Sequence, residues 1–478
     1  MDFYETTPRH DLTYSDVFLV PSHSSVGSRM AVSLSPGDGT PATIPLVASN
    51  MNSVTGPRLA ASLARRGGLG VLPQDLSDDD MAEALAWVRN QPIDLDSAVF
   101  LSPRDTVEKA LLLVPPLPGH GVVLQNDGEL VGVVDAERLA TAMPGAELGD
   151  IARTITHSID RSEFDSPREL FDLLVERELN FVPVVVGDTV IGTTSMKSSL
   201  RSTLYLPALD SDGALAVAAA LGINGDVGAR ARALVAAGAC ALVLDTAHGH
   251  QEGMVRAIET VAALDLGVPL VAGNVVTSAA VRDLVGAGAT IIKVGVGPGA
   301  MCTTRMMTAV GRPQFSAVLE TAATARELGA HVWADGGVRY PRDVALALAA
   351  GAASVMIGSW FAGTIEAPGE LRHDDAGALY KTSWGMASTK AVRARFGGLD
   401  AYDLARKELF AEGISGSKIY LDPARPSLDD LVDMITSGVR SSCTYAGAAT
   451  LTEFRERALV GIQSAAGYEE GKALPVSW

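Results

Sequence analysis

Eight short apolar runs, each followed by an amphipathic helical pattern, constrain the fold of this 478-residue chain more than any other feature. Gly, Asn or Asp stands at the junctions, as is typical of βα units around a parallel sheet. The runs lie at residues 44–49, 68–72, 215–223, 241–247, 269–274, 290–296, 331–337 and 354–360. Eight such units predict an α/β fold, a (β/α)8 or TIM barrel, with an open doubly wound sheet as the alternative.

Three of the runs are preceded by the same helix ending. The endings are Ala237-Gly238-Ala239, Ala287-Gly288-Ala289 and Ala350-Gly351-Ala352. Glycine permits a helix to stop in a left-handed conformation, and small neighbours let the helix pack close to the next strand. The repetition supports consecutive αβ junctions of one kind.

Residues 94–205 interrupt the barrel pattern with a different, internally doubled one. Ser102-Pro103-Arg104 opens a predicted helix and is followed by two short apolar runs, and Ser166-Pro167-Arg168 opens a second copy. A tandem repeat of one helix and a small sheet inserted in a loop predicts a second domain. The barrel and its extensions then comprise residues 1–93 and 206–478. The insertion resembles a tandem pair of CBS domains, which are nucleotide-sensing regulatory repeats.

Charge and cysteine content exclude several classes of function. Lys and Arg total 38 against 56 Asp and Glu, a formal net charge of −18, which repels a polyanion such as DNA or RNA. A small phosphate ligand stays possible, because a few backbone N–H groups can bind one locally. Three cysteines without a CxxC spacing, a polar N-terminal stretch and no long apolar segment predict a reduced, cytoplasmic protein without a membrane role.

The loop after the sixth run carries the strongest candidate for catalysis. Ligands of such barrels bind at the carboxyl ends of the strands, and here Gly295, Gly297 and Gly299 alternate around Pro298 and lead to Cys302. A thiol held on this kind of loop near a cationic group, here Arg305, is a candidate nucleophile. The alternative is a small buried thiol beside a turn. Cys240 lies inside an apolar run, and Cys443 has no comparable loop.

The loops after the seventh and eighth runs predict a nucleotide-binding surface. Asp335-Gly336-Gly337 suits a carboxylate that binds ribose hydroxyls beside glycines that admit a phosphate, and Gly358-Ser359 offers further phosphate donors. Many barrels bind phosphate at these two positions. His248 and His250 lack a third ligand at a suitable spacing, so a polar contact is favoured over a catalytic transition metal.

Together these residues resemble the IMP dehydrogenase and GMP reductase family. Residues 295–305 with 310–314 are similar to its catalytic-cysteine loop. Further similar segments are residues 12–17, 49–51, 245–250, 272–275, 335–337, 362–364, 368–370 and 385–386. The resemblance implies a barrel with a CBS insertion that assembles as a homotetramer or homooctamer. It also implies a cysteine that attacks carbon-2 of a purine mononucleotide.

The resemblance assigns roles residue by residue. It implies Cys302 as the nucleophile, with Thr304 and Glu412 moving protons. The implied nucleotide-binding residues are Ser49, Met51, Asp335, Gly336, Gly337, Gly358, Ser359, Gly385 and Met386. Asp245, Asn274 and Gly295 would face a nicotinamide cofactor. Backbone carbonyls of Gly297, Gly299 and Cys302 match a site for K⁺ or another monovalent cation.

Two reactions occur in the family, and the motifs favour the reductase. Tyr402 lacks the preceding Arg of the water-activating pair that dehydrogenases use, and residues 443–448 and 305–314 are closer to the reductases. Residues 245–250 have the dehydrogenase form, and Ala300, Asn52 and Ser383 depart from the usual pattern. We expect NADPH-dependent reductive deamination of GMP to IMP and ammonia, in purine salvage, through a covalent Cys302 thioimidate. The alternative is oxidation of IMP to XMP with NAD.

A function of another class remains open. In it the barrel is inert and the CBS pair, binding ATP or GTP, makes the chain a nucleotide-sensing regulator. The presence of Cys302, Thr304 and Glu412 together in this sequence favours the enzyme.

Overall fold

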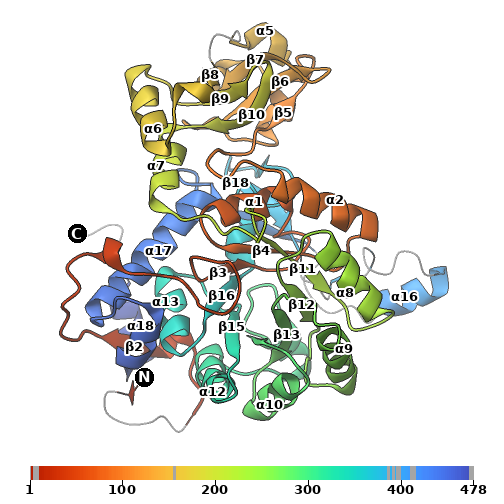
Figure 1. Ribbon diagram of the computed structural model, residues 1–478, viewed down its shortest axis with the longest axis vertical. Coiled ribbons are helices and arrows are strands. Elements are labelled where there is room, and N and C mark those ends of the chain that lie inside the picture. Colours follow the sequence, from red (N-terminus) through yellow and green to blue (C-terminus); the bar gives the residue numbers. More distant parts are fainter. Residues whose placement is uncertain are drawn as a thin grey trace.

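A closed barrel of eight parallel strands forms the centre of the protein (Figure 1). The computed structural model describes residues 2–3, 10–153, 158–384, 388–389, 393, 400–409 and 416–472. The strands follow one another around the barrel in the order β11-β12-β13-β14-β15-β16-β3-β4, and each neighbouring pair is parallel. The predicted (β/α)8 barrel is therefore confirmed, and the open sheet is wrong.

Every barrel strand falls on one of the eight predicted runs. The strands are β3 (Leu46–Ala48), β4 (Leu69–Leu72), β11 (Val217–Leu221), β12 (Leu242–Asp245), β13 (Leu270–Val275), β14 (Ile291–Val294), β15 (His331–Asp335) and β16 (Ser354–Ile357). Most runs extend beyond their strand at the carboxyl end, because their last residues leave the ladder and turn over the barrel mouth. The sequence therefore located the strands but overestimated their lengths.

Helices on the outside of the barrel follow these strands. They include α1 (Pro57–Arg65), α2 (Asp78–Arg89), α8 (Val227–Ala236), α9 (Glu252–Ala262), α10 (Ser278–Gly286), α12 (Gln314–Glu327), α13 (Pro341–Ala349) and the short α14 (Ser359–Ala362). Gly288 and Gly351, which follow the ends of α10 and α13, have φ of +116° and +115°. A Cβ at these positions would lie 2.6 Å from Ala262 Cβ and 2.8 Å from Ala322 Cβ. The predicted glycine stops are confirmed, and they also permit close helix contacts.

Side chains fill the inside of the barrel, so the barrel has no pore. Val71, Val243, Trp333 and Met356 belong to a fully buried cluster that is separate from the larger core between strands and helices. The indole N–H of Trp333 donates to Asp38 Oδ2 at 2.7 Å. Any ligand cavity must therefore lie at an end of the barrel.

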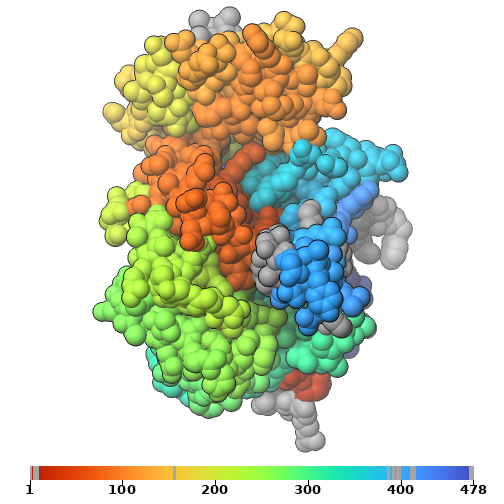
Figure 2. All heavy atoms as spheres, turned by 90° about the vertical axis from the view of Figure 1, so that its right-hand side faces the viewer, coloured from red at the N-terminus to blue at the C-terminus, as the bar shows by residue number. Residues whose placement is uncertain are grey.

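The chain between β4 and β11 forms two sheets of three strands each. One contains β5 (Phe100–Leu101), β6 (Gly121–Asn126) and β7 (Glu129–Asp135), and the other β8 (Ile159–Asp160), β9 (Val182–Val186) and β10 (Thr189–Thr194). Helices α3 (Val107–Leu111), α4 (Ala136–Thr141), α5 (Leu148–Ile151), α6 (Pro167–Glu176) and α7 (Met196–Leu204) accompany them. Figure 2 shows this insertion, in orange and yellow, as a lobe at one end of the molecule.

The two copies in the insertion begin their helices differently. Ser166 caps α6 and Pro167 occupies its first turn, as expected. In the first copy the expected helix start at Pro103 is wrong, because Asp105 accepts the Ser102 N–H at 2.8 Å and holds a turn there. Thr106 then caps α3, its hydroxyl accepting the Lys109 N–H at 3.3 Å.

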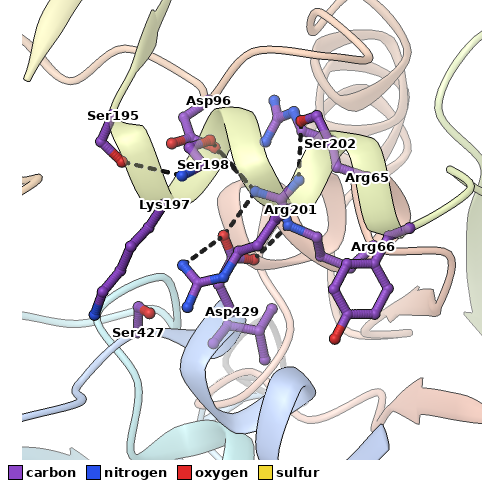
Figure 3. A network of polar contacts seen from close by, with 12 residues as sticks. Arg65, Arg66, Asp96, Ser195, Lys197, Ser198, Arg201, Ser202, Ser427 and Asp429 are labelled. Carbon is purple, nitrogen blue, oxygen red and sulfur yellow. Dashed lines mark hydrogen bonds and ion pairs between the residues drawn. The ribbon is translucent and has the colours of Figure 1, made fainter. Parts of the chain in front are cut away.

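A buried charge network joins the insertion to the barrel and to α17 (Leu428–Tyr445) (Figure 3). Arg66, just after α1 and 1% exposed, lies 2.8 Å from Asp429 and 3.4 Å from Asp96. Arg201 of α7 lies 2.6 Å from Asp430 and 2.8 Å from Asp433. Although burial opposes ionisation, Arg66 and Arg201 outweigh it and keep the pKa of Asp429 below its ordinary value. We call these residues the joint network.

The remaining elements flank the barrel. Strands β1 (Asp2–Phe3), β2 (Val17–Val20) and β20 (Leu459–Ile462) form one small sheet, and β17 (Arg372–His373), β18 (Leu379–Ser383) and β19 (Ser417–Tyr420) form another. Helices α11 (Thr304–Thr308), α16 (Ala401–Leu409), α18 (Leu451–Arg457) and α19 (Ala465–Glu470) complete the described chain. None of the helices in the described part has the length and apolar character needed to cross a membrane.

Candidate active site

A cavity of about 840 Å³ opens at the carboxyl ends of the barrel strands. All eight strands contribute to its wall, through their last residues or the segments that follow them, as expected for this fold. The predicted site residues that line it are Ser49, Met51, Asp245, Asn274, Gly295, Gly297, Gly299, Cys302, Thr304, Asp335, Gly336, Gly337, Gly358 and Ser359. Three further predicted residues, Gly385, Met386 and Glu412, lie outside the described residues.

The loop between β14 and α11 brings Cys302 to the cavity. Gly295 and Gly297 have φ of +153° and +81°, and a Cβ at either position would lie 2.2 Å from a neighbouring atom, Asp335 O or Arg305 Cγ. Only glycine allows the loop to pass so close to these groups. The Cys302 N–H donates to Gly299 O at 3.0 Å, and its thiol donates to Thr304 Oγ1 at 3.2 Å. An exposed thiol with a hydroxyl partner therefore faces the cavity.

The other two thiols are placed differently. Cys240 packs against the cluster inside the barrel, and Cys443 is fully buried in α17. Burial raises the pKa of both thiols to about 12, so they stay protonated near neutral pH. Neither lines the cavity. Of the three thiols, Cys302 is therefore the one on the cavity wall.

Two carboxylates and one ammonium form a buried cluster at the floor of the cavity. Lys293 Nζ lies 2.9 Å from Asp245 Oδ1 and 2.6 Å from Asp335 Oδ2. Burial by itself disfavours the ammonium, but the two carboxylates outweigh it and raise the pKa of Lys293 above its ordinary value. Lys293 is therefore charged.

Amide side chains orient both carboxylates. Asn50 donates to Asp245 Oδ2 at 2.8 Å, and Asn274 donates to Asp335 Oδ2 at 2.9 Å. No group in the part of the chain that the structure describes donates to Asp335 Oδ1. This oxygen is thus available to a donor on a ligand.

Several polar atoms of the cavity wall are buried and have no hydrogen-bond partner among the residues that the structure describes. They are Ser49 Oγ, Thr246 Oγ1 and Asn274 Oδ1. Buried polar atoms in folded proteins nearly always have a hydrogen-bond partner. Their presence around one cavity therefore indicates a polar ligand.

Sequence reasoning missed several residues of the site. Lys293, Asn50, Arg339 and Lys407 of α16 line the cavity, and Gln314 Nε2 donates to Val294 O at 2.8 Å and to Asp335 O at 3.1 Å. One signal was available, since Lys293 interrupts an apolar strand and a buried charge requires partners. Asn50 and Gln314 stand inside segments 49–51 and 310–314, which resemble the family, but neither was given a role, whereas Arg339 and Lys407 carry no comparable signal.

The structure also places residues at which the sequence departs from the family pattern or at which a metal was considered. Ala300 lines the cavity without offering a side-chain donor. The Ser383 hydroxyl lies 2.9 Å from Ser53 Oγ, and Ser383 is absent from the cavity wall. His250 Nε2 lies 2.7 Å from Asp283 Oδ2, outside the cavity. His250 thus makes a polar contact with a carboxylate.

The fold and the cavity define a (β/α)8 barrel with a polar ligand site at the carboxyl ends of its strands. Residues 11–473 match the IMP dehydrogenase / GMP reductase domain, and the chain belongs to this family of oxidoreductases. The predicted family membership is thereby confirmed.

Named relatives occur in both branches of the family. The chain is 53% identical over 473 residues to proteins named GMP reductase from Mycobacterium tuberculosis and Mycobacterium bovis, with 98% of each chain covered. It is 34% identical over 455 residues to inosine-5'-monophosphate dehydrogenase of Halalkalibacterium halodurans, covering 94% of this chain and 92% of that one. A solved GMP reductase of Trypanosoma brucei, a cysteine-to-alanine variant in complex with guanosine 5'-monophosphate, is 30% identical with a TM-score of 0.67. That similarity covers 98% of this chain and 99% of the other.

Proposed function

We propose that the protein is a GMP reductase, which converts GMP to IMP and ammonia with NADPH as the reductant. The observation that carries this choice is the difference in identity between the two branches. Identity is 53% to named GMP reductases and 34% to a named IMP dehydrogenase, over nearly the whole chain in both cases.

Cys302 begins the proposed reaction as the nucleophile. Its thiolate adds to carbon-2 of the purine, and the carbon–nitrogen bond to the 2-amino group breaks as that group leaves with a proton as ammonia. Sγ then holds the purine as a thioimidate. The Thr304 hydroxyl, 3.2 Å from Sγ, is close enough to take part in the proton transfer, and the family pattern adds Glu412.

The nucleotide would bind along the loops of β15, β16 and β3. Asp335 Oδ1 accepts a ribose hydroxyl, and Gly336, Gly337, Gly358 and Ser359 contact the phosphate. Ser49 and Met51 contact the nucleotide, together with Gly385 and Met386 in this proposal.

The cavity also fits a nicotinamide beside the nucleotide. Thr246 Oγ1, just after β12, and Asn274 Oδ1, in β13, are buried without partners in the described part of the chain, and a carboxamide or ribose hydroxyl would satisfy them. Asp245, Asn274 and Gly295 would hold this group. When bound, it supplies the hydride that replaces sulfur at carbon-2 and returns Cys302 to its thiolate.

A K⁺ or other monovalent cation would bind the carbonyls of Gly297, Gly299 and Cys302. The Gly299 carbonyl already accepts the Cys302 N–H at 3.0 Å and keeps a second lone pair for the ion. The cation would thus fix the loop that carries the nucleophile.

Residues 94–205 complete the proposal as a CBS pair that binds ATP or GTP in a cytoplasmic homotetramer or homooctamer. Light scattering and steady-state kinetics with saturating ATP or GTP test this part. Unchanged size and unchanged kinetics would remove the regulatory role.

One absorbance experiment tests the reaction. Purified protein is given GMP with NADPH in one cuvette and IMP with NAD in another, both with K⁺, and absorbance of the reduced nicotinamide is followed. Loss of NADPH with equimolar ammonia supports the reductase. Formation of NADH from IMP would make the protein a dehydrogenase, and no change in either cuvette would favour the inert regulator.

A further inference from the structure

Lys293 occupies a position in the site that none of the proposed catalytic or binding roles explains. It lies on β14 with a side chain that is 3% exposed, and its ammonium contacts Asp245 at the end of β12 and Asp335 at the end of β15. Those two strands stand on opposite sides of β14 in the barrel order. One buried cation thus connects carboxylates from two separate parts of the barrel mouth.

The two carboxylates belong to different subsites of the proposed reaction. Asp335 borders the glycine loops assigned to the nucleotide, and Asp245 borders the wall assigned to the nicotinamide. Their amide partners are separate, since Asn50 donates to Asp245 and Asn274 to Asp335. Among the described residues, only Lys293 donates to both.

Charge balance explains why this contact matters. Two buried carboxylates without a cation between them would repel each other, and one would take up a proton. A protonated carboxyl loses acceptor capacity and turns to share its proton, so its position toward a ligand changes. The ammonium removes both effects at once, because its N–H groups reach both side chains at hydrogen-bond distance.

We propose that Lys293 is the positioning residue common to the two subsites, holding Asp335 for the nucleotide and Asp245 for the nicotinamide. The proposal rests on the proposed function. It assigns Lys293 no contact with the reacting atoms. It differs from a purely structural role because one substitution must impair the use of two different substrates.

The test compares KM values for GMP and NADPH in Lys293→Gln, Lys293→Arg, Asp245→Asn and Asp335→Asn. We expect Lys293→Gln to raise both KM values by about tenfold or more, as loss of a residue that orients a ligand-binding group does elsewhere. Each aspartate variant should raise mainly one KM, and Lys293→Arg should restore part of both. The acid limb of kcat/KM should move to higher pH in Lys293→Gln.

A matched control removes the same charge elsewhere. Lys472→Gln breaks an exposed pair with Glu469, and both KM values should stay as in the unmodified protein. A change in only one KM for Lys293→Gln, or an unmoved acid limb, would overturn the proposal. If the unmodified protein does not turn over GMP, the proposed function is overturned instead, so the two failures can be told apart.

A second variant covers the case in which Lys293→Gln does not fold. Lys293→Gln with Asp245→Asn removes one positive and one negative charge and leaves Asp335 as the single carboxylate of the cluster. We expect its KM for GMP to exceed that of Asp245→Asn alone. Equal values would show that Lys293 does not position Asp335.

Discussion

Two clusters of buried charge in this protein differ in how completely their members are paired. At the barrel mouth, the Lys293 ammonium contacts both Asp245 and Asp335. Among the described residues, no group donates to Asp335 Oδ1, and Ser49 Oγ, Thr246 Oγ1 and Asn274 Oδ1 have no partner. In the joint network, Arg66 contacts Asp429, Asp96, Ser198 and Ser202 (Figure 3). Arg201 contacts Asp430 and Asp433. The second cluster satisfies itself within the protein.

This difference in pairing distinguishes a site that binds a ligand from a cluster that holds parts of the protein together. Leaving buried polar atoms without partners costs free energy, so such a cluster is maintained where a ligand supplies the missing contacts. A cluster whose charged groups are all paired has no free hydrogen-bonding group for a ligand. Removing one of its side chains leaves an uncompensated buried charge. Substitutions at the mouth should therefore change activity, and substitutions in the joint network should change stability.

The largest effect is expected for Cys302→Ala. Turnover of GMP should fall by roughly 10³-fold or more because no other group can form the covalent bond, whereas GMP binding should persist through its ribose and phosphate contacts. Stopped-flow absorbance measures the first quantity and calorimetry the second. Cys240→Ala is the control and should keep its turnover. Appreciable turnover in Cys302→Ala would remove the covalent mechanism.

Asp429→Ala should break the joint network without touching the cavity. Because Arg66 loses its 2.8 Å partner inside the fold, we expect the free energy of unfolding to fall by about 3–5 kcal/mol. Urea denaturation measures this loss, and the KM for GMP of the folded protein should not change. An unaltered denaturation midpoint would contradict the assignment of this network to stability.

Glu366, near the joint network, should make stability depend on pH. Its burial raises its pKa to about 7, although Arg58 opposes the shift. The unfolded state releases this proton near pH 4.3, so between about pH 4.3 and 7 the native state binds more protons and stability falls as pH rises.

Glu366→Gln removes this titration and keeps an acceptor for the Leu428 N–H, which Glu366 accepts at 2.8 Å. Relative to the unmodified protein, the variant should gain up to roughly 4 kcal/mol as pH rises through that window. Denaturation at a series of pH values measures the gain. Parallel stability curves for the two proteins would refute the pH effect.

The smallest effect is expected for the exposed pair Arg168–Asp172 of α6. Its atoms are 3.0 Å apart, but both side chains are more than half exposed, so Asp172→Ala should change the unfolding free energy by less than about 1 kcal/mol. The same denaturation assay applies. A loss as large as that of Asp429→Ala would show that burial does not distinguish the two ion pairs.

The eight strands could be predicted because their signal is local. Each is a short apolar run next to an amphipathic helix, and Gly288 and Gly351 mark helix stops by their own backbone requirement. The start of α3 could not be predicted as well. Ser102 and Thr106 are both suitable caps, and the turn held by Asp105 decides between them.

The candidate site was predictable to the extent that its residues follow strand ends or glycine loops. Cys302, Asp335 and Gly358 have this property, and all three line the cavity. Lys407 comes from helix α16, where no local pattern distinguishes it from an ordinary helix residue, and Gln314 begins helix α12, where its place in segment 310–314 does not indicate its contacts. Only the packing of those helices brings them to the site or to its supporting contacts.

The sequence by itself therefore determined the barrel, the family and the loop that presents Cys302. These follow from periodicity and from residue types that act through their own backbone or their immediate neighbours. Only the tertiary structure decided that Lys293 joins Asp245 to Asp335, and that Arg66 joins α17 to the insertion. Buried charges choose partners by distance in space, and residues far apart in the chain carry no local record of that distance.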